Sequence, residues 1–161
     1  MDAQYKAELK PLLDQLQPQS VLCLGAPCDN AVRDYVATAP GRLAQHCAEP
    51  PETLGRFDLV IVAELLERLD KTRGTQLLAR LRDLHGGRFL LIIPAAPQPG
   101  HASHWDSNEL LALGLVQAGH YPAADGEHHL YRFDLDDYKT TPDWLNPRFW
   151  AHPERWDKDF W

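Results

Sequence analysis

Two histidines and an acidic residue lie within six positions, in the pattern His101-Ala-Ser-His104-Trp-Asp106. Imidazole and carboxylate groups can ligate zinc or iron, and a histidine can also act as a general base. Histidines three positions apart in an irregular loop follow no established ligand spacing, and the chain holds 8 histidines, so chance pairs are expected. We therefore predict no metal site and take His104 as a candidate catalytic residue. Solvent exposure or loop packing of both histidines is the alternative.

A carboxylate, Glu64, follows directly after the most apolar run of the chain, residues 57–63. At the end of a buried strand such an acid could hold a substrate or act as a base. The alternative is an exposed carboxylate beside the N-terminus of the next helix, where negative charge is favourable. We predict that Glu67 and Arg68 form a solvated helix face.

A third candidate position is Gly25, which ends the short apolar run of residues 20–24. Only glycine allows both a sharp turn and a close approach of a ligand to the backbone. Of the three cysteines, Cys23 and Cys28 flank this glycine, and Cys47 lies further along. Since no second pair completes a zinc site, we predict reduced thiols packed as small apolar groups. A nucleophilic Cys28 at a helix N-terminus is the alternative.

Elements that would position these residues follow from the hydrophobic pattern. Continuous apolar runs without alternation indicate strands covered on both faces, and they alternate with segments of helical periodicity. The expected strands are 20–24, 42–47, 57–63 and 89–93, and the expected helices are 4–16, 30–38, 72–84 and 109–118. Two antiparallel strands, at 119–121 and 128–135, are joined through Asp125-Gly126. The pattern predicts an α/β fold, a Rossmann-like doubly wound and mostly parallel sheet with an antiparallel C-terminal strand pair.

Composition narrows the classes of partner. The chain has 161 residues, enough for one domain, and a formal net charge of −7. Nucleic acid is not an expected partner, because phosphate binding rests on clustered Lys and Arg. No stretch approaches the roughly 20 apolar residues that span a bilayer, so no membrane association is expected. The opening residues lack the form of a signal peptide, and three cysteines fit a reducing compartment, which together predict a cytoplasmic protein.

The last 25 residues differ from the rest in composition. Residues 137–161 contain four of the five tryptophans and show no period. We predict a domain over 1–136 and an aromatic C-terminal extension over 137–161 that packs on it. A segment that binds a protein partner is the alternative, since exposed aromatic clusters mark contact sites.

Three segments in this order, 21–25, 55–69 and 77–94, resemble the successive motifs of class I S-adenosylmethionine-dependent methyltransferases. The later stretch 118–121 is similar to the start of that family's last strands, so the resemblance covers about residues 9–135. It implies S-adenosylmethionine as cofactor and a small-molecule or unknown methyl acceptor. Carried over position by position, it places Gly25, Asp29 and Glu49 at the cofactor and Glu64 and His104 on the acceptor side.

The sequence departs from the family pattern at the first loop. The family has an acid, a hydrophobe and then Gly-x-Gly-x-Gly, whereas this chain has Cys23, one glycine, Pro27 and Asp29. The stretch before residue 57 has room for one strand where the family has two, so one strand is missing. Glu49 would contact the ribose if that strand is the second, or lie near the adenine if it is the third. Two functions follow: a methyltransferase of unknown acceptor, or a degenerate domain without cofactor that acts as an interaction or regulatory module.

Overall fold

The computed structural model describes residues 4–48 and 55–138. Glu49 and the aromatic segment from residue 139 onward lie outside these ranges. In chain order the elements are α1 (Gln4–Leu16), β1 (Ser20–Gly25), α2 (Asn30–Ala37), β2 (Leu43–Cys47), β3 (Leu59–Ala63), the 3₁₀ turn η1 (Leu66–Arg68), α3 (Lys71–Arg80), the π-helical turn η2 (Leu81–His85), β4 (Arg88–Pro94), α4 (Ser107–Ala112), β5 (Val116–Ala123), β6 (Gly126–Asp134) and α5 (Leu135–Tyr138).

Six strands of the described residues form one sheet in the order β2-β1-β3-β4-β6-β5. The first four run parallel, and β6 pairs antiparallel with both β4 and β5. The sheet confirms the predicted α/β class with its antiparallel C-terminal pair. Because β2 lies directly beside β1, it takes the second place of the doubly wound order 3-2-1-4-5.

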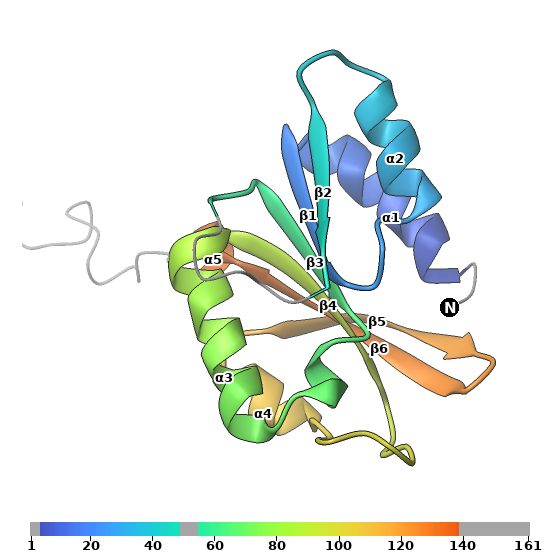
Figure 1. Ribbon diagram of the computed structural model, residues 1–161, viewed down its shortest axis with the longest axis vertical. Coiled ribbons are helices and arrows are strands. Elements are labelled where there is room, and N and C mark those ends of the chain that lie inside the picture. Colours follow the sequence, from blue (N-terminus) through green and yellow to red (C-terminus); the bar gives the residue numbers. More distant parts are fainter. Residues whose placement is uncertain (1–3, 49–54, 139–161) are drawn as a thin grey trace, which may run out of the picture.

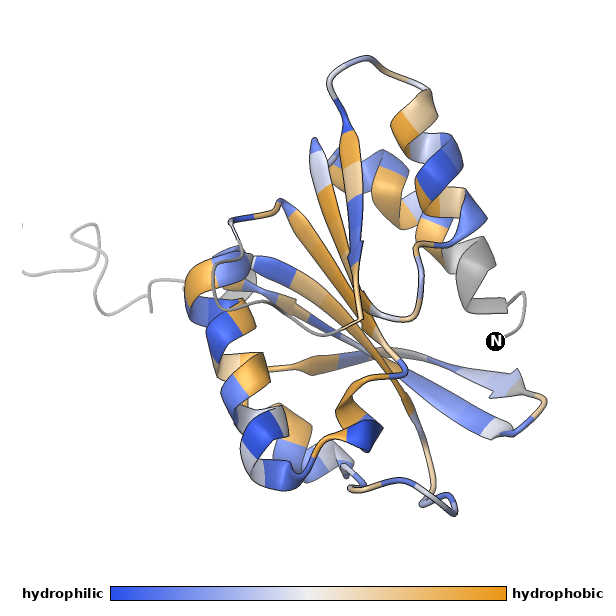
Figure 2. Ribbon diagram, in the orientation of Figure 1, coloured by the Kyte–Doolittle hydropathy of each residue, from blue (hydrophilic) through white to orange (hydrophobic). Residues whose placement is uncertain are grey.

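Helices cover both faces of the sheet, with α1 and α2 on one side and α3 and α4 on the other (Figure 1). Alternate residues of β1 therefore enter two separate apolar cores. Leu22 and Leu24 pack with α3 and α4, whereas Val21 and Cys23 pack with α1 and α2. Every residue of β3 is buried, as its continuous apolar run predicts. Figure 2 shows this apolar centre of the sheet and the more polar outer halves of the strands β5 and β6 in their hairpin.

One predicted helix is wrong in its second half. The pattern of 109–118 indicated a single helix, but α4 ends at Ala112 and residues from Val116 onward form β5. Gly114 adopts φ +88°, and the Leu115 N–H donates to the Leu110 carbonyl at 3.0 Å. A residue in the left-handed region is a usual helix terminator, so Gly114 stops the helix within an apolar sequence.

No helix in the described part of the chain combines the length and the apolar character needed to cross a membrane.

Candidate functional site

The carboxyl end of β1 packs tightly against the end of β3. Gly25 has φ +81°, and a Cβ atom at this position would lie 2.2 Å from the Ala63 carbonyl oxygen and 2.8 Å from Leu65 Cβ. The next amide, that of Ala26, donates to the same Ala63 oxygen at 2.8 Å. Glycine is therefore required here by the packing of two chain segments against each other.

Other polar groups of the loop after β1 are also bonded within the protein. His46 Nε2 donates to the Gly25 carbonyl at 3.1 Å. Asp29 is the N-cap of α2, and its Oδ1 accepts from the Ala31 amide at 2.8 Å. Pro27 has no amide hydrogen to offer. These contacts occupy groups through which such a loop would hold a ligand.

The two cysteines that flank Gly25 form a disulfide. Cys23 and Cys28 are bonded across the turn, with their Cα atoms 5.4 Å apart. The prediction of reduced packing thiols is wrong for this pair, because the turn at Gly25 folds the chain back and brings the two side chains together. A disulfide sulfur has no thiolate, so the alternative of a nucleophilic Cys28 does not hold for this state. The cellular compartment stays a prediction.

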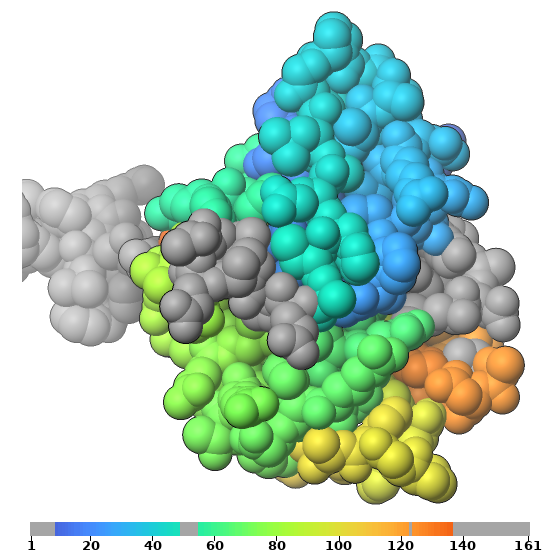
Figure 3. All heavy atoms as spheres, in the orientation of Figure 1, coloured from blue at the N-terminus to red at the C-terminus, as the bar shows by residue number. Residues whose placement is uncertain are grey.

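A cavity of about 400 Å³ opens at the carboxyl ends of β3 and β4, and no residue of the loop after β1 is among those that line it. Three segments enclose it: the turn after β3, the loop after β4 and the tip of the β5–β6 hairpin. Figure 3 shows these segments meeting on one face of the molecule, in green, yellow and orange. Its charged and titratable lining comes from Glu64, Glu67, Arg68, His101, Asp125 and His128.

Glu64 lies on this cavity with its backbone in the left-handed region, at φ +55°. A residue with a side chain is uncommon in that region, and such conformations gather at functional sites. Arg68 Nη2 donates to Glu64 Oε2 at 3.3 Å. The structure thus places the predicted acid at the rim of the cavity, paired with a cation one turn further along.

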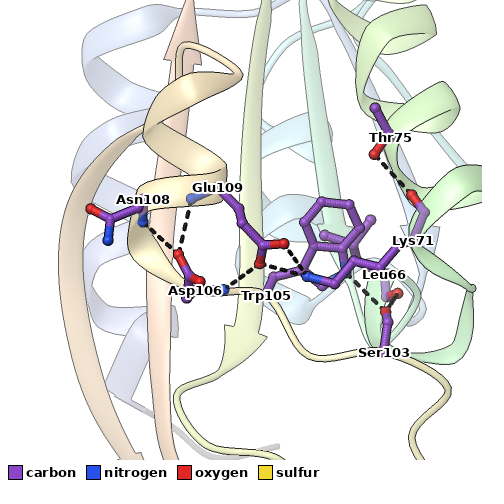
Figure 4. Close-up of polar contacts among 8 residues, drawn as sticks. All are labelled: Leu66, Lys71, Thr75, Ser103, Trp105, Asp106, Asn108 and Glu109. Atoms are coloured by element: carbon purple, nitrogen blue, oxygen red, sulfur yellow. Dashed lines mark hydrogen bonds and ion pairs between the residues drawn. The ribbon is translucent and has the colours of Figure 1, made fainter.

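Hydrogen bonds to the turn η1 position the loop after β4. The amides of Ala102 and Ser103 donate to the Glu67 carbonyl at 2.8 and 3.2 Å. Ser103 Oγ donates to the Leu66 carbonyl at 3.2 Å, and Trp105 Nε1 donates to Ser103 Oγ at 2.9 Å. Figure 4 shows this anchor, in which the indole lies beneath the Lys71 ammonium. The loop is thereby fixed against η1 and carries His101 to Glu67.

His104, the other predicted histidine, is not among the residues that line this cavity. It borders a separate small void of about 10 Å³, which it shares with Glu67 and Trp105. His101 borders both spaces. The structure therefore places Glu64 and His101 together at the cavity, whereas His104 lies outside its lining.

Asp106, the acid of the histidine motif, is the N-cap of α4. Its Oδ1 accepts from the amides of Asn108 and Glu109 at 2.8 and 3.0 Å, and Glu109 Oε2 accepts from the Asp106 amide. The Asp106 carboxylate is therefore engaged in a reciprocal capping box and is not free to ligate a metal ion. Within residues 4–48 and 55–138, no group of three or more His, Cys, Asp or Glu side chains is arranged to hold a metal ion.

Sequence reasoning missed Glu67, which is only 7% exposed. The prediction of a solvated helix face is wrong at this residue, because the loop after β4 covers it. Glu67 follows Glu64 by three positions, and both residues line the same cavity. Burial raises the pKa of the Glu67 carboxyl above its ordinary value of 4.5, and its own backbone N–H and the nearby His101 offset only part of this rise.

Replacing this carboxylate by its neutral isostere is expected to stabilise the fold. Because the folded state binds the Glu67 proton more tightly than the unfolded chain, wild-type stability falls as pH rises from 4.5 through the raised pKa. At pH 8 we expect Glu67→Gln to raise the free energy of unfolding by about 1 kcal/mol, or Tm by about 3 °C. The gain should vanish below pH 4.5, where both side chains are neutral. Urea unfolding at both pH values measures it.

The exposed Glu127 on β6 provides the control. Glu127→Gln removes one negative charge without changing a buried group, so its stability should follow the wild type at both pH values. A Glu67→Gln variant that is less stable than the wild type at pH 8 would contradict the electrostatic penalty.

Comparison with protein families gives one match. A family model described as a family of unknown function (DUF6231) matches residues 3–161. A search of curated proteins finds no match.

Solved structures with a similar fold are methyltransferases. Magnesium protoporphyrin IX methyltransferase from Synechocystis PCC 6803, with bound S-adenosylhomocysteine, superposes with a TM-score of 0.60 at 14% identity, covering 80% of each chain. The 1,6-didemethyltoxoflavin-N1-methyltransferase of Burkholderia thailandensis gives 0.56 at 16% identity over 82% of this chain and 78% of that one. The small RNA methyltransferase HEN1 gives 0.54 at 10% identity over 83% and 26%.

At these identities the likeness concerns the fold alone, and the acceptors named for these enzymes differ widely. The family match spans nearly the whole sequence. The chain therefore belongs to the family of unknown function DUF6231, and it has the fold of the class I methyltransferases.

Proposed function

We propose that this protein is a binding module on a methyltransferase fold that does not use S-adenosylmethionine. The observation that carries the proposal is the closed loop after β1. In the methyltransferase pattern this loop holds the cofactor through a glycine-rich backbone, which leaves amide groups and space for the ligand. The described residues of this loop do not fit that task.

Three contacts support the closed state. The Ala26 amide is bonded to Ala63, the Gly25 carbonyl is bonded to His46, and Leu65 fills the space beside Gly25. A cofactor at this position would have to replace all three, and the disulfide limits how far the loop can move. Gly25 and Asp29 as cofactor contacts thus remain predictions without support from the loop geometry, and Glu49 lies outside the described residues.

Methyl transfer is the second candidate, and the fold favours it. Enzymes of this fold bind S-adenosylhomocysteine, and the cavity at the ends of β3 and β4 would be the place for an acceptor. In that case Gly25, Asp29 and Glu49 would hold the cofactor, and Glu64 would face the acceptor. Under either candidate we propose residues 137–161 as an aromatic extension that packs on the 1–136 domain, with a surface for a protein partner as the alternative.

Titration with S-adenosylmethionine and S-adenosylhomocysteine separates the two candidates. A ligand at about 1 mM with a Kd of about 10 μM would stabilise the fold by about 2.7 kcal/mol and raise Tm by about 5–10 °C. We expect neither a thermal shift nor heat in calorimetry for either compound. A methyltransferase with known affinity, titrated under the same conditions, shows that the ligands are active. Saturable binding of either compound would overturn the proposal.

A further inference from the structure

Two buried polar atoms at the cavity have no hydrogen-bond partner among the described residues: Glu67 Oε2 and His128 Nδ1. Their residues are 7% and 8% exposed, and both side chains line the cavity. An unpartnered buried polar group lowers the stability of the folded state, because its hydration is lost and not replaced. Two such groups at one cavity, beside the left-handed backbone of Glu64, indicate that the local structure is kept for a ligand and not for stability.

Both atoms are hydrogen-bond acceptors. An ionised carboxylate can only accept, and rotation about the last Glu67 torsion is soft, so either oxygen can face the cavity. His128 Nε2 lies 3.6 Å from Asp125 Oδ2. A neutral imidazole carries its proton on the nitrogen that faces the carboxylate, which leaves a lone pair on Nδ1. The missing partner of each group is therefore a donor.

Charge at the cavity is negative. Glu64, Glu67 and Asp125 contribute carboxylates, and Arg68 is the cation among the lining residues. The Arg68 guanidinium is engaged by Glu64 at 3.3 Å. Glu67 and Asp125 thus face the cavity from two different segments, and among the described residues no Lys or Arg cation forms an ion pair with either carboxylate. A positively charged ligand would supply one.

We propose that this cavity binds a small molecule through its primary ammonium group. Such a group carries one positive charge and three N–H donors, so it supplies a partner to Glu67 and to His128 at the same time. A volume of about 400 Å³ accommodates a small organic amine. The proposal goes beyond the absence of cofactor binding and does not depend on it, because the cavity lies apart from the loop after β1.

Calorimetry with putrescine as the probe tests the site on the full chain. We expect saturable binding by the wild type and at least about tenfold weaker binding by Glu67→Gln, since a charge-assisted hydrogen bond is lost. Asp125→Asn, at a largely exposed side chain, should weaken binding as well without endangering the fold. Asp83→Asn removes a carboxylate outside the cavity, on the surface beside Arg82, and should bind like the wild type.

Tetramethylammonium separates charge from hydrogen bonding, since it carries the charge but has no N–H donor. It should bind at least about tenfold more weakly than putrescine. Equal binding of the two cations, no putrescine binding by the wild type, or undiminished binding by Glu67→Gln and Asp125→Asn would each overturn the proposal. None of these outcomes bears on S-adenosylmethionine, so failure here is distinguishable from failure of the proposed function.

Discussion

Gly25→Ala is expected to lower the free energy of unfolding by about 2–5 kcal/mol, a large fraction of the stability of an ordinary domain. The methyl group would lie 2.2 Å from the Ala63 carbonyl oxygen, which is backbone and cannot rotate away. Forcing a methyl into such a packed site costs about 1–3 kcal/mol, and the left-handed conformation at φ +81° adds about 1–2 kcal/mol for any L-residue. Soluble yield and urea unfolding of the purified variant measure the effect.

Gly41→Ala is the matched control, because Gly41 shares the conformation without the crowding. Its φ is +88°, and a Cβ atom there would meet nothing within 4 Å. We expect a loss of about 1 kcal/mol, from the backbone conformation alone. Equal losses for the two variants would contradict the close contact between the loop after β1 and the end of β3.

Trp105→Leu is expected to destabilise the fold by about 2–3 kcal/mol, because a large aromatic side chain is removed from the core between α3 and α4. The indole is 5% exposed, and the Lys71 Nζ atom lies over its face, 4.3 Å from the ring centroid. Its Nε1 also donates a hydrogen bond to Ser103 Oγ, and the variant loses this bond, which helps to position the loop that contains His101. We expect weaker putrescine binding in addition to the lower stability, measured by calorimetry and urea unfolding.

A second substitution, Gly74→Ala, tests whether the indole is packed as described. In α3, a Cβ atom at Gly74 would lie 2.5 Å from Trp105 Cζ2, so the variant should lose stability in the wild-type background. Alanine is otherwise better than glycine within a helix by about 1 kcal/mol. In the Trp105→Leu background the severe clash is gone and only Leu66 Cδ1, at 3.1 Å, must shift slightly, so Gly74→Ala should become stabilising. The same sign in both backgrounds would contradict the contact.

Local pattern is enough to predict most of the architecture. The apolar run that becomes β3 is found as predicted, and the hairpin turn is found one residue earlier than predicted, at Ala124-Asp125, with Gly126 as the first residue of β6. Asp29 as the N-cap of α2 is likewise a local feature, because the cap depends on its immediate neighbours. The end of α4 could not be placed, since apolar residues continue through Gly114 and suit a helix and a buried strand alike.

The candidate site depends on contacts between distant segments, and local pattern does not contain them. Glu67 reads as an exposed residue of a short turn until the loop around Ser103 covers it. His128 lies in a predicted strand, and nothing near it in sequence indicates that the hairpin tip meets η1. The disulfide of Cys23 and Cys28 depends on the direction in which the chain turns at Gly25, which spacing alone does not specify.

The hydrogen bond from Ala26 to Ala63 continues the pairing of β1 with β3 beyond the edge of the sheet. In a doubly wound sheet the crevice between the strands at the switch point is where ligands enter. Here one additional hydrogen bond joins β1 and β3 at that crevice, and a cavity opens at the neighbouring strand ends, at β3, β4 and the hairpin. On the proposed function, the position of the ligand site in such a fold therefore depends on which neighbouring strand ends stay unpaired, and the hydrogen bond of a single peptide group is enough to change that position.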